Sequence, residues 1–173
     1  VSRHGVINSH FSTESGMLMD EAIMNVILEK YHIRIGRKAA ETLKMALGVE
    51  WDLNRDTRIC EVCGISTITE LPVKIAVTGE IVAQALNPIL YRIFSGITSV
   101  IQMTPPAILG DIREHGIVLI GGVAQLKGLK ELVLKVTDMK AHVADHPSYV
   151  NAVGAGSALE YMDYFRDSLQ DLH

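Results

Sequence analysis

The chain has 173 residues, 48% of them hydrophobic, which is enough for one globular domain or for one domain with an inserted subdomain. A formal net charge of -4, with basic residues scattered along the sequence, argues against a nucleic-acid partner. No stretch reaches the ~20 consecutive apolar residues of a membrane span, and the start at Val1 shows no secretory signal. These features predict a cytoplasmic protein.

Two helices are expected near the start of the chain. Residues 1–8 resemble the end of a strand entered from upstream, which suggests a truncated N-terminus. Gly16 is expected to form a turn before an amphipathic helix over residues 20–29, where acids in the first turn suit the helix dipole. A second helix over residues 36–47 should end at Gly48, which can act as its C-cap.

Residues 51–77 change to an alternating pattern of β-forming residues. This pattern predicts a small antiparallel meander with strands near residues 57–62, 65–69 and 73–77, and it places Pro72 at the edge of a strand.

Cys60 and Cys63 in this meander form a C-x-x-C spacing, which could indicate a redox pair or half of a zinc site. Residues three apart in a strand point to opposite faces, and no second cysteine pair completes a metal site. Two reduced cysteines are therefore favoured.

A long helix is expected to begin after Thr78, because apolar residues recur there every three to four positions as far as Ile101. Pro88 should kink this helix. The segment Thr104-Pro105-Pro106 should end it and start a short helix over residues 107–114.

Residues 117–120 are four consecutive apolar residues, typical of a strand covered on both faces, and the glycine pair Gly121-Gly122 follows them directly. Because glycine has no β-carbon, the backbone N–H groups there can approach a phosphate or nucleoside closely. The residues alone leave two interpretations open, a nucleotide-binding turn and an ordinary turn, and they favour the ordinary turn.

The last third of the chain predicts a helix that buries Leu126, Leu129, Leu132 and Val133, then a strand over residues 139–144 and a turn over residues 145–148. A final helix over residues 149–169 is expected to place several apolar residues in the core: Val150, Val153, Leu159, Met162 and Phe165. Gly154 and Gly156 in that helix should let another element or a ligand come close. The order of elements predicts an α/β layer with a small α+β insertion.

Several short motifs, in their order and spacing, make the chain similar to a known family. They are Asp20-Glu21-Ala22-Ile23 after Gly16, Ala40-Glu41-Thr42-Leu43-Lys44, Leu71-Pro72, Thr104-Pro105-Pro106 with Asp111-Ile112, Gly116 to Leu129, Val143-Ala144-Asp145 with Pro147, and Gly154-Ala155-Gly156 before Ala158-Leu159-Glu160. On these motifs the chain resembles, over essentially its whole length, the bacterial actin-like proteins of the MreB type. That family lies within the actin, Hsp70 and sugar-kinase superfamily.

The resemblance implies the C-terminal half of an actin-like ATPase fold. Residues 1–32 and 79–173 would form a ribonuclease-H-like subdomain (IIA-like), and residues 33–78 a small inserted subdomain (IIB-like). The other phosphate loops, the catalytic residues and the carboxylates that hold Mg2+ would lie upstream of Val1, so neither a catalytic nor a metal-binding residue is expected within the 173 residues. A chain without them should hydrolyse essentially no ATP.

The same resemblance implies an ATP site. Gly121, Gly122 and Val123 would face the nucleoside and the neighbouring phosphate, while Glu41 and Lys44 would contact the ribose or the adenine edge. From the residues alone, Glu41 and Lys44 are three apart on one helix and favour a surface ion pair. Val123 stands where the family usually has a third glycine and Met17 where it usually has an acid. These departures suggest a divergent member, in which Val123 either weakens ATP binding or only shifts the loop.

Two functions follow from the resemblance. The first is an ATP-binding cytoskeletal subunit that stacks head to tail into membrane-associated filaments and maintains rod cell shape, with membrane contact made outside these 173 residues. The alternative is an actin-like scaffold with a degenerate nucleotide site that docks partners such as the membrane-anchored adaptor RodZ, through the long helix or the C-terminal helix. A small-molecule kinase or a chaperone ATPase of the same superfamily fits less well, because the insert resembles the MreB version.

Overall fold

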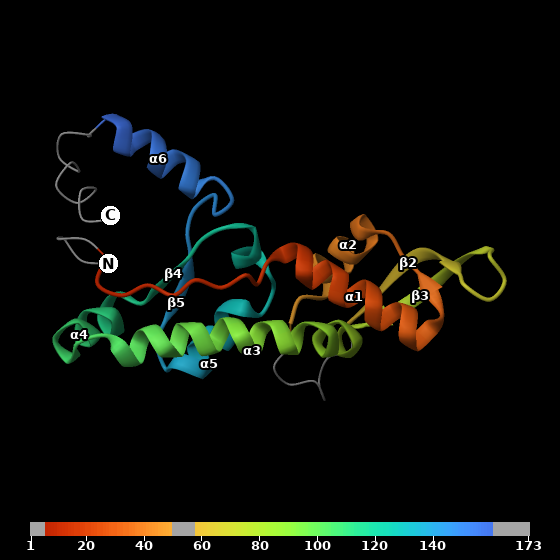
Figure 1. Cartoon of the computed structure of the whole chain (residues 1–173), viewed down its shortest axis with the longest axis horizontal. Coiled ribbons are helices and arrows are strands. Elements are labelled where there is room, and N and C mark those ends of the chain that lie inside the picture. The colour runs from red at the N-terminus through yellow and green to blue at the C-terminus, as the bar shows by residue number, and fades with distance from the viewer. Residues whose placement is uncertain (1–5, 50–57, 161–173) are drawn as a thin grey trace.

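The computed structural model describes residues 6–49 and 58–160. In this part of the chain, helix α3 (Gly79–Met103) runs along the long axis of the molecule (Figure 1). It packs against α1, α2 and β3 toward its start and against α5 further along. The helix continues through Pro88 without interruption, and no helix of the described residues is both long and apolar enough to cross a membrane.

One end of the molecule holds a three-stranded antiparallel sheet and two helices. The elements are α1 (Gly16–Tyr31), β1 (Ile33–Arg34), α2 (Arg37–Leu47), β2 (Ile59–Ser66) and β3 (Pro72–Thr78). The strand order is β1-β2-β3, with Ile33 opposite Ser66 and Ile59 opposite Thr78. Pro72 begins the edge strand β3, as expected, since its missing N–H costs least there.

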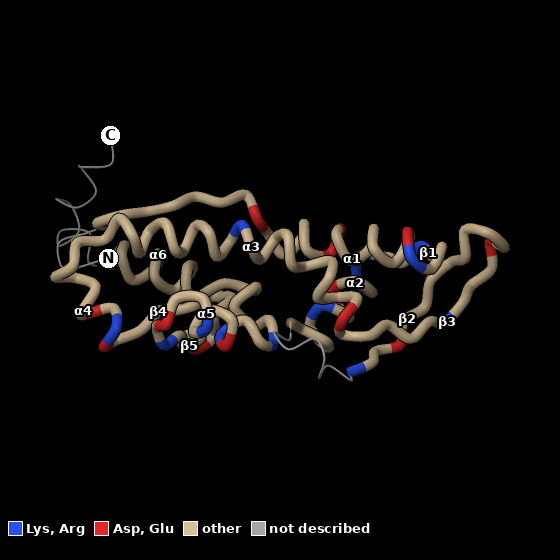
Figure 2. Tube along the Cα trace, turned by 90° about the horizontal axis from the view of Figure 1, so that it is seen from below, with Lys and Arg blue, Asp and Glu red and all other residues tan. Residues whose placement is uncertain are grey.

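The other end holds a parallel pair of strands. The elements are α4 (Pro106–His115), β4 (Ile117–Leu119), the 3-10 helix η2 (Gly122–Gln125), α5 (Leu129–Thr137) and β5 (Ala141–Val143). Strand β4 pairs in parallel with β5, and α5 makes the crossover between them. Basic and acidic residues are interspersed here rather than gathered by sign (Figure 2).

Within the residues that the structure describes, one apolar core joins both ends. Its members come from α1, α2 and α3, from the sheet and from α5. The side chains that are almost completely buried are Met19, Ile23, Ile27, Leu43, Leu47, Val77, Val82, Leu86 and Val133. Each contributes about 1.5 to 3 kcal/mol by leaving water, so the core fixes α1 and α2 against α3.

The helix expected over residues 20–29 begins earlier, at Gly16, so the expected turn at Gly16 is wrong. The reason is a cap: the Ser15 side chain accepts a hydrogen bond from the Leu18 N–H at 3.3 Å. The second helix agrees with the prediction, including its end at Gly48, which has φ of 61°.

The meander differs from the prediction in its strands. Residues 65–69 are not a separate strand, because β2 runs on to Ser66 and the chain then turns through Glu70, which has φ of 57°. Strand β1 was not predicted, since two residues are too short to show an alternating pattern. Residues 50–57, where the meander was expected to start, lie outside the described residues. The two cysteines are free, as predicted.

Two apolar segments that were predicted to be buried are partly or largely exposed. In strand β4, which ends at Leu119, Val118 is 55% exposed because its face of the sheet is open to solvent, whereas Ile117 and Leu119 are half-buried against the core. Helix α6 (Val150–Glu160) has no buried residue, with Val153 and Leu159 exposed.

Helix α6 stands apart from the other elements (Figure 1). A β-carbon on Gly154 or Gly156 would meet nothing within 4 Å, so the close approach of another element of the described chain is wrong, while that of a ligand stays a prediction. Met162 and Phe165, expected in the core, lie outside the described residues, as do residues 1–5 of the expected first strand. Residues 6–8 are not in a strand.

Candidate functional site

A pocket of about 530 Å3 lies between the first turn of α1, the middle of α2 and the η2 turn. Its lining combines hydroxyl, amide and charged groups with methionine, valine and leucine side chains. The lining residues are Ser15, Gly16, Met17, Met19, Asp20, Glu41, Lys44, Met45, Gly122, Val123, Gln125, Leu126 and Ser148. A mixed lining of this kind suits a small ligand with one hydrogen-bonding edge and one apolar face.

The structure brings four of the five sequence-predicted site residues to this pocket: Glu41, Lys44, Gly122 and Val123. The fifth, Gly121, is not among the lining residues. Its N–H donates to the Pro147 carbonyl oxygen at 2.7 Å and its φ is 85°. Gly121 therefore fixes the conformation of the turn without lining the pocket.

Gly122 leaves the backbone of the turn open toward the pocket. A β-carbon built there would meet nothing within 4 Å. The turn leads into a 3-10 helix, and α5 begins only at Leu129. The open backbone is the feature that a close-approaching ligand requires.

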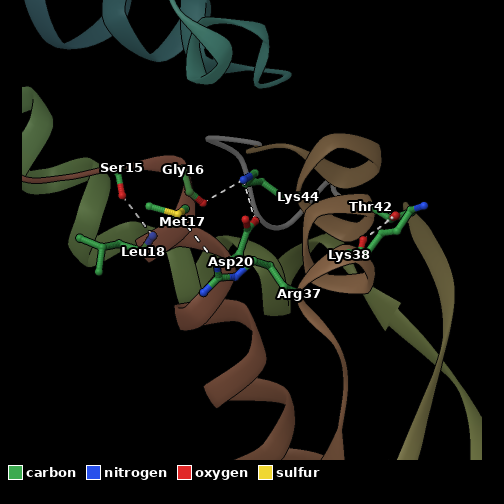
Figure 3. Close-up of polar contacts among 9 residues, drawn as sticks. All are labelled: Ser15, Gly16, Met17, Leu18, Asp20, Arg37, Lys38, Thr42 and Lys44. Carbon is green, nitrogen blue, oxygen red and sulfur yellow. Dashed lines mark hydrogen bonds and ion pairs between the residues drawn. The ribbon is translucent and has the colours of Figure 1, made fainter.

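Lys44 does not form the expected surface ion pair with Glu41. Its ammonium is buried and donates to Asp20 Oδ1 at 2.6 Å and to the Gly16 carbonyl oxygen at 3.0 Å (Figure 3). The Asp20 and Lys44 side chains are 7% and 9% exposed. Glu41 is exposed.

Asp20 is therefore a site residue that sequence reasoning missed, because it was interpreted as an acid that suits the helix dipole. A signal was present: Asp20 precedes Ile23 and Ile27 at the spacing of the helix's buried face. An acid on that face requires a buried partner.

A second ion pair joins α1 to α2 at the surface. Arg37 donates to Glu21 Oε1 at 3.1 Å, and both side chains are at least half exposed. The same guanidinium approaches Met17 Sδ at 3.8 Å (Figure 3), and Met17 lines the pocket. An exposed pair of this kind contributes well under ~1 kcal/mol.

Two hydrogen bonds connect the end of α2 to the loop after η2, and α2 and η2 both line the pocket. The Val49 N–H donates to the Lys127 carbonyl oxygen at 2.8 Å, and Lys127 Nζ donates to the Ala46 carbonyl oxygen at 3.0 Å. These bonds hold the end of α2 against the loop that follows η2. They set the separation between Lys44 on one wall and Gly122 on the other.

The described residues contain no group of three or more His, Cys, Asp or Glu side chains that could hold a metal ion. The pocket itself contributes two carboxylates, Asp20 and Glu41, and Asp20 is already paired with Lys44.

The fold is that of one part of the actin-like filament proteins. A structure of MreB5 of Spiroplasma citri bound to ADP matches with a TM-score of 0.78 at 22% identity, over 87% of this chain and 46% of that one. The MamK double helical filament matches with a TM-score of 0.64 at 21% identity, over 80% and 42%. The α/β actin-like fold class predicted from the sequence is thus confirmed.

The family model described as MreB/Mbl protein matches residues 1–167, and the chain belongs to this family. It is 32% identical over 163 residues to the cell shape-determining protein MreB of Escherichia coli K12, and 30% identical over 163 residues to Mbl of Bacillus cereus. These alignments cover 94% of this chain but 47% and 49% of the relatives. The chain thus spans about half the length of the curated relatives it matches.

Proposed function

We propose that the pocket between α1, α2 and the η2 turn binds the adenosine part of ATP or ADP. The observation that carries this proposal is the meeting of Gly122 and Val123 with Glu41 and Lys44 in one pocket, although the two pairs lie far apart in the sequence. A solved structural neighbour, MreB5, carries ADP in one structure and AMPPNP in another.

In this proposal each pocket residue has a role that its chemistry allows. Lys44 donates from its ammonium and Glu41 accepts at the ribose or the adenine edge. Gly122 and Val123 contact the nucleoside and the neighbouring phosphate, and Gly121 holds their turn in place through its bond to Pro147. ATP would bind with Mg2+, which is held mainly by groups outside the 173 residues, and no catalytic residue is assigned within them.

The proposed division into subdomains follows the same boundaries. The inserted subdomain, residues 33–78, contains the whole antiparallel sheet and α2, and α3 begins at Gly79. Residues 1–32 and 79–173 form the ribonuclease-H-like subdomain. The pocket then lies where the two meet, since α2 contributes one wall and η2 the other.

The whole protein, in this proposal, is a cytoplasmic filament subunit that maintains rod cell shape, with the filament associated with the membrane. Head-to-tail stacking is a heterologous contact that generates open filaments. A fold neighbour, MamK, is a double helical filament, and the curated relatives are named as cell shape-determining proteins. Nucleotide in the pocket would bias the relative angle of two lobes and so couple nucleotide state to polymer stability.

Titration calorimetry of the complete gene product with ATP and Mg2+, followed by pelleting of polymer, tests this function. We expect saturable binding and nucleotide-dependent polymer. Absence of polymer across salt and lipid conditions would overturn the filament function, and absence of nucleotide binding would overturn the site.

A second candidate function, a scaffold with a degenerate nucleotide site, is favoured by one observation. The Val123 side chain extends toward the first turn of α1, where its Cγ2 lies 3.5 Å from the position of a β-carbon on Gly16. This narrows the pocket. Partner docking, on α3 or on the exposed α6, with an adaptor of the RodZ type but without nucleotide binding would support the scaffold.

A further inference from the structure

Asp20 and Lys44 form an ion pair in which both charged side chains are buried, and both residues line the pocket. Removing two charges from water costs several kcal/mol per ion, and the attraction between them only offsets this cost when the geometry is good. Apolar replacements of such pairs are often equally stable. Stability alone is thus a weak reason for this pair.

The contacts of the Lys44 ammonium suggest that the buried pair has a role in ligand binding. An ammonium has three N–H donors, and within the described residues two of them are taken, by Asp20 Oδ1 at 2.6 Å and by the Gly16 carbonyl oxygen at 3.0 Å. Both acceptors lie in the first part of α1, so the ammonium is anchored from one side. The third N–H remains for an acceptor in the pocket.

We propose that Asp20 is a positioning residue that holds the Lys44 ammonium at the wall of the pocket, with one N–H directed to an uncharged acceptor of the ligand. The proposal rests on the proposed nucleotide site. It adds that the Asp20 carboxylate already neutralises Lys44, so that this wall accepts a hydroxyl or a ring nitrogen in preference to a phosphate. The phosphates then lie toward the open backbone at Gly122.

A matched control exists in the same two helices. Glu21 on α1 pairs with Arg37 on α2, but this pair is exposed and neither residue lines the pocket. If Asp20 acted only by joining α1 to α2, Glu21→Gln and Asp20→Asn would differ in stability alone. If Asp20 positions Lys44, they differ in ligand affinity.

The test is a double-mutant cycle on the dissociation constant for ADP, measured on the complete gene product, with the melting temperature of each variant recorded. The variants are Asp20→Asn, Lys44→Met, the double variant and Glu21→Gln. We expect Asp20→Asn and Lys44→Met each to weaken ADP binding about tenfold, as the loss of one hydrogen bond to a charged group does. The double variant should weaken it no further, and Glu21→Gln should leave it unchanged.

Additive losses, or unchanged affinity in folded Asp20→Asn, would overturn the positioning role while the nucleotide site stands. If Asp20→Asn fails to fold, Lys44→Met is compared with the double variant. Equal affinities support the proposal, because Asp20 then acts only through Lys44, and a further loss in the double variant overturns it. If the unsubstituted protein binds no ADP, both the proposed function and this inference fail.

Discussion

A β-carbon on Gly128 would overlap the carbonyl oxygen of Val49, so the backbones of these two residues lie too close together for any side chain at position 128. Gly128 also has φ of 84°, a conformation that glycine adopts readily and other residues do not. This contact joins the loop after η2 to the end of α2. It therefore fixes the two walls of the candidate site relative to each other.

Gly128→Ala should destabilise the protein by about 2 kcal/mol or more, because the substitution combines left-handed strain with a backbone clash. Chemical denaturation measures the change. Gly154→Ala is the control: it lies in a helix, meets nothing within 4 Å and should be neutral or slightly stabilising. Equal stability of the two variants would contradict the close approach.

Gly122→Ala should separate binding from folding. A β-carbon there meets nothing within 4 Å in the free protein, so the free energy of unfolding should change by less than about 0.5 kcal/mol. The added methyl group enters the pocket and should weaken nucleotide binding about tenfold, as measured by calorimetry. Gly110→Ala, equally open but on α4, should bind as the unsubstituted protein does. Unchanged affinity in Gly122→Ala would place the ligand elsewhere.

Val123→Gly should strengthen nucleotide binding several-fold, since it removes the side chain that extends toward Gly16. It should also lower stability by about 1 kcal/mol, because Val123 packs against the core and glycine has more freedom when unfolded. Fluorescence titration with a labelled ATP analogue measures the affinity. Weaker binding would show that the valine contacts the ligand favourably instead of narrowing its site.

The ion pair between Glu14 and Arg92 predicts a pH dependence. Arg92 donates to both Glu14 oxygens, through Nε and Nη2, which ties the segment before α1 to α3. These hydrogen bonds, together with the charge of Arg92, lower the pKa of the Glu14 carboxyl from 4.5. Because the pKa is lower in the folded state, the ionised Glu14 stabilises that state above pH 4.5. This stabilisation is lost as the pH falls through the pKa of Glu14 in the folded protein.

Glu14→Gln should therefore unfold more easily than the unsubstituted protein at neutral pH, and the difference should shrink once the pH falls below 4.5. Urea denaturation across the pH range tests this. The same difference at neutral and at acid pH would contradict an ionic contribution.

The sequence predicted the helices well, because α2, α3 and α4 have clear apolar spacing and visible ends such as Gly48 and Pro105-Pro106. The start of α1 was misplaced because the Ser15 cap was not recognised. Helix α6 was wrongly assigned to the core, since periodicity reports an apolar face but not what covers it.

Prediction of the candidate site was also limited by what a local sequence pattern can report. The glycine turn and Glu41 with Lys44 were predicted from the sequence and from the family resemblance, and Glu41, Lys44, Gly122 and Val123 line one pocket, but the partner of Lys44 was not predicted. Spacing along one helix suggested Glu41, three residues away, whereas the fold supplies Asp20 from a different helix. Contacts between elements distant in sequence depend on packing, which no local pattern encodes.

A structure of the complete gene product crystallised with ADP tests the central claim most directly. We predict density for the adenosine in the pocket, between Glu41 and Lys44 on α2 and Gly122 and Val123 on the η2 turn, with Lys44 still bonded to Asp20. Density for ADP at any other place, with this pocket empty, would contradict it.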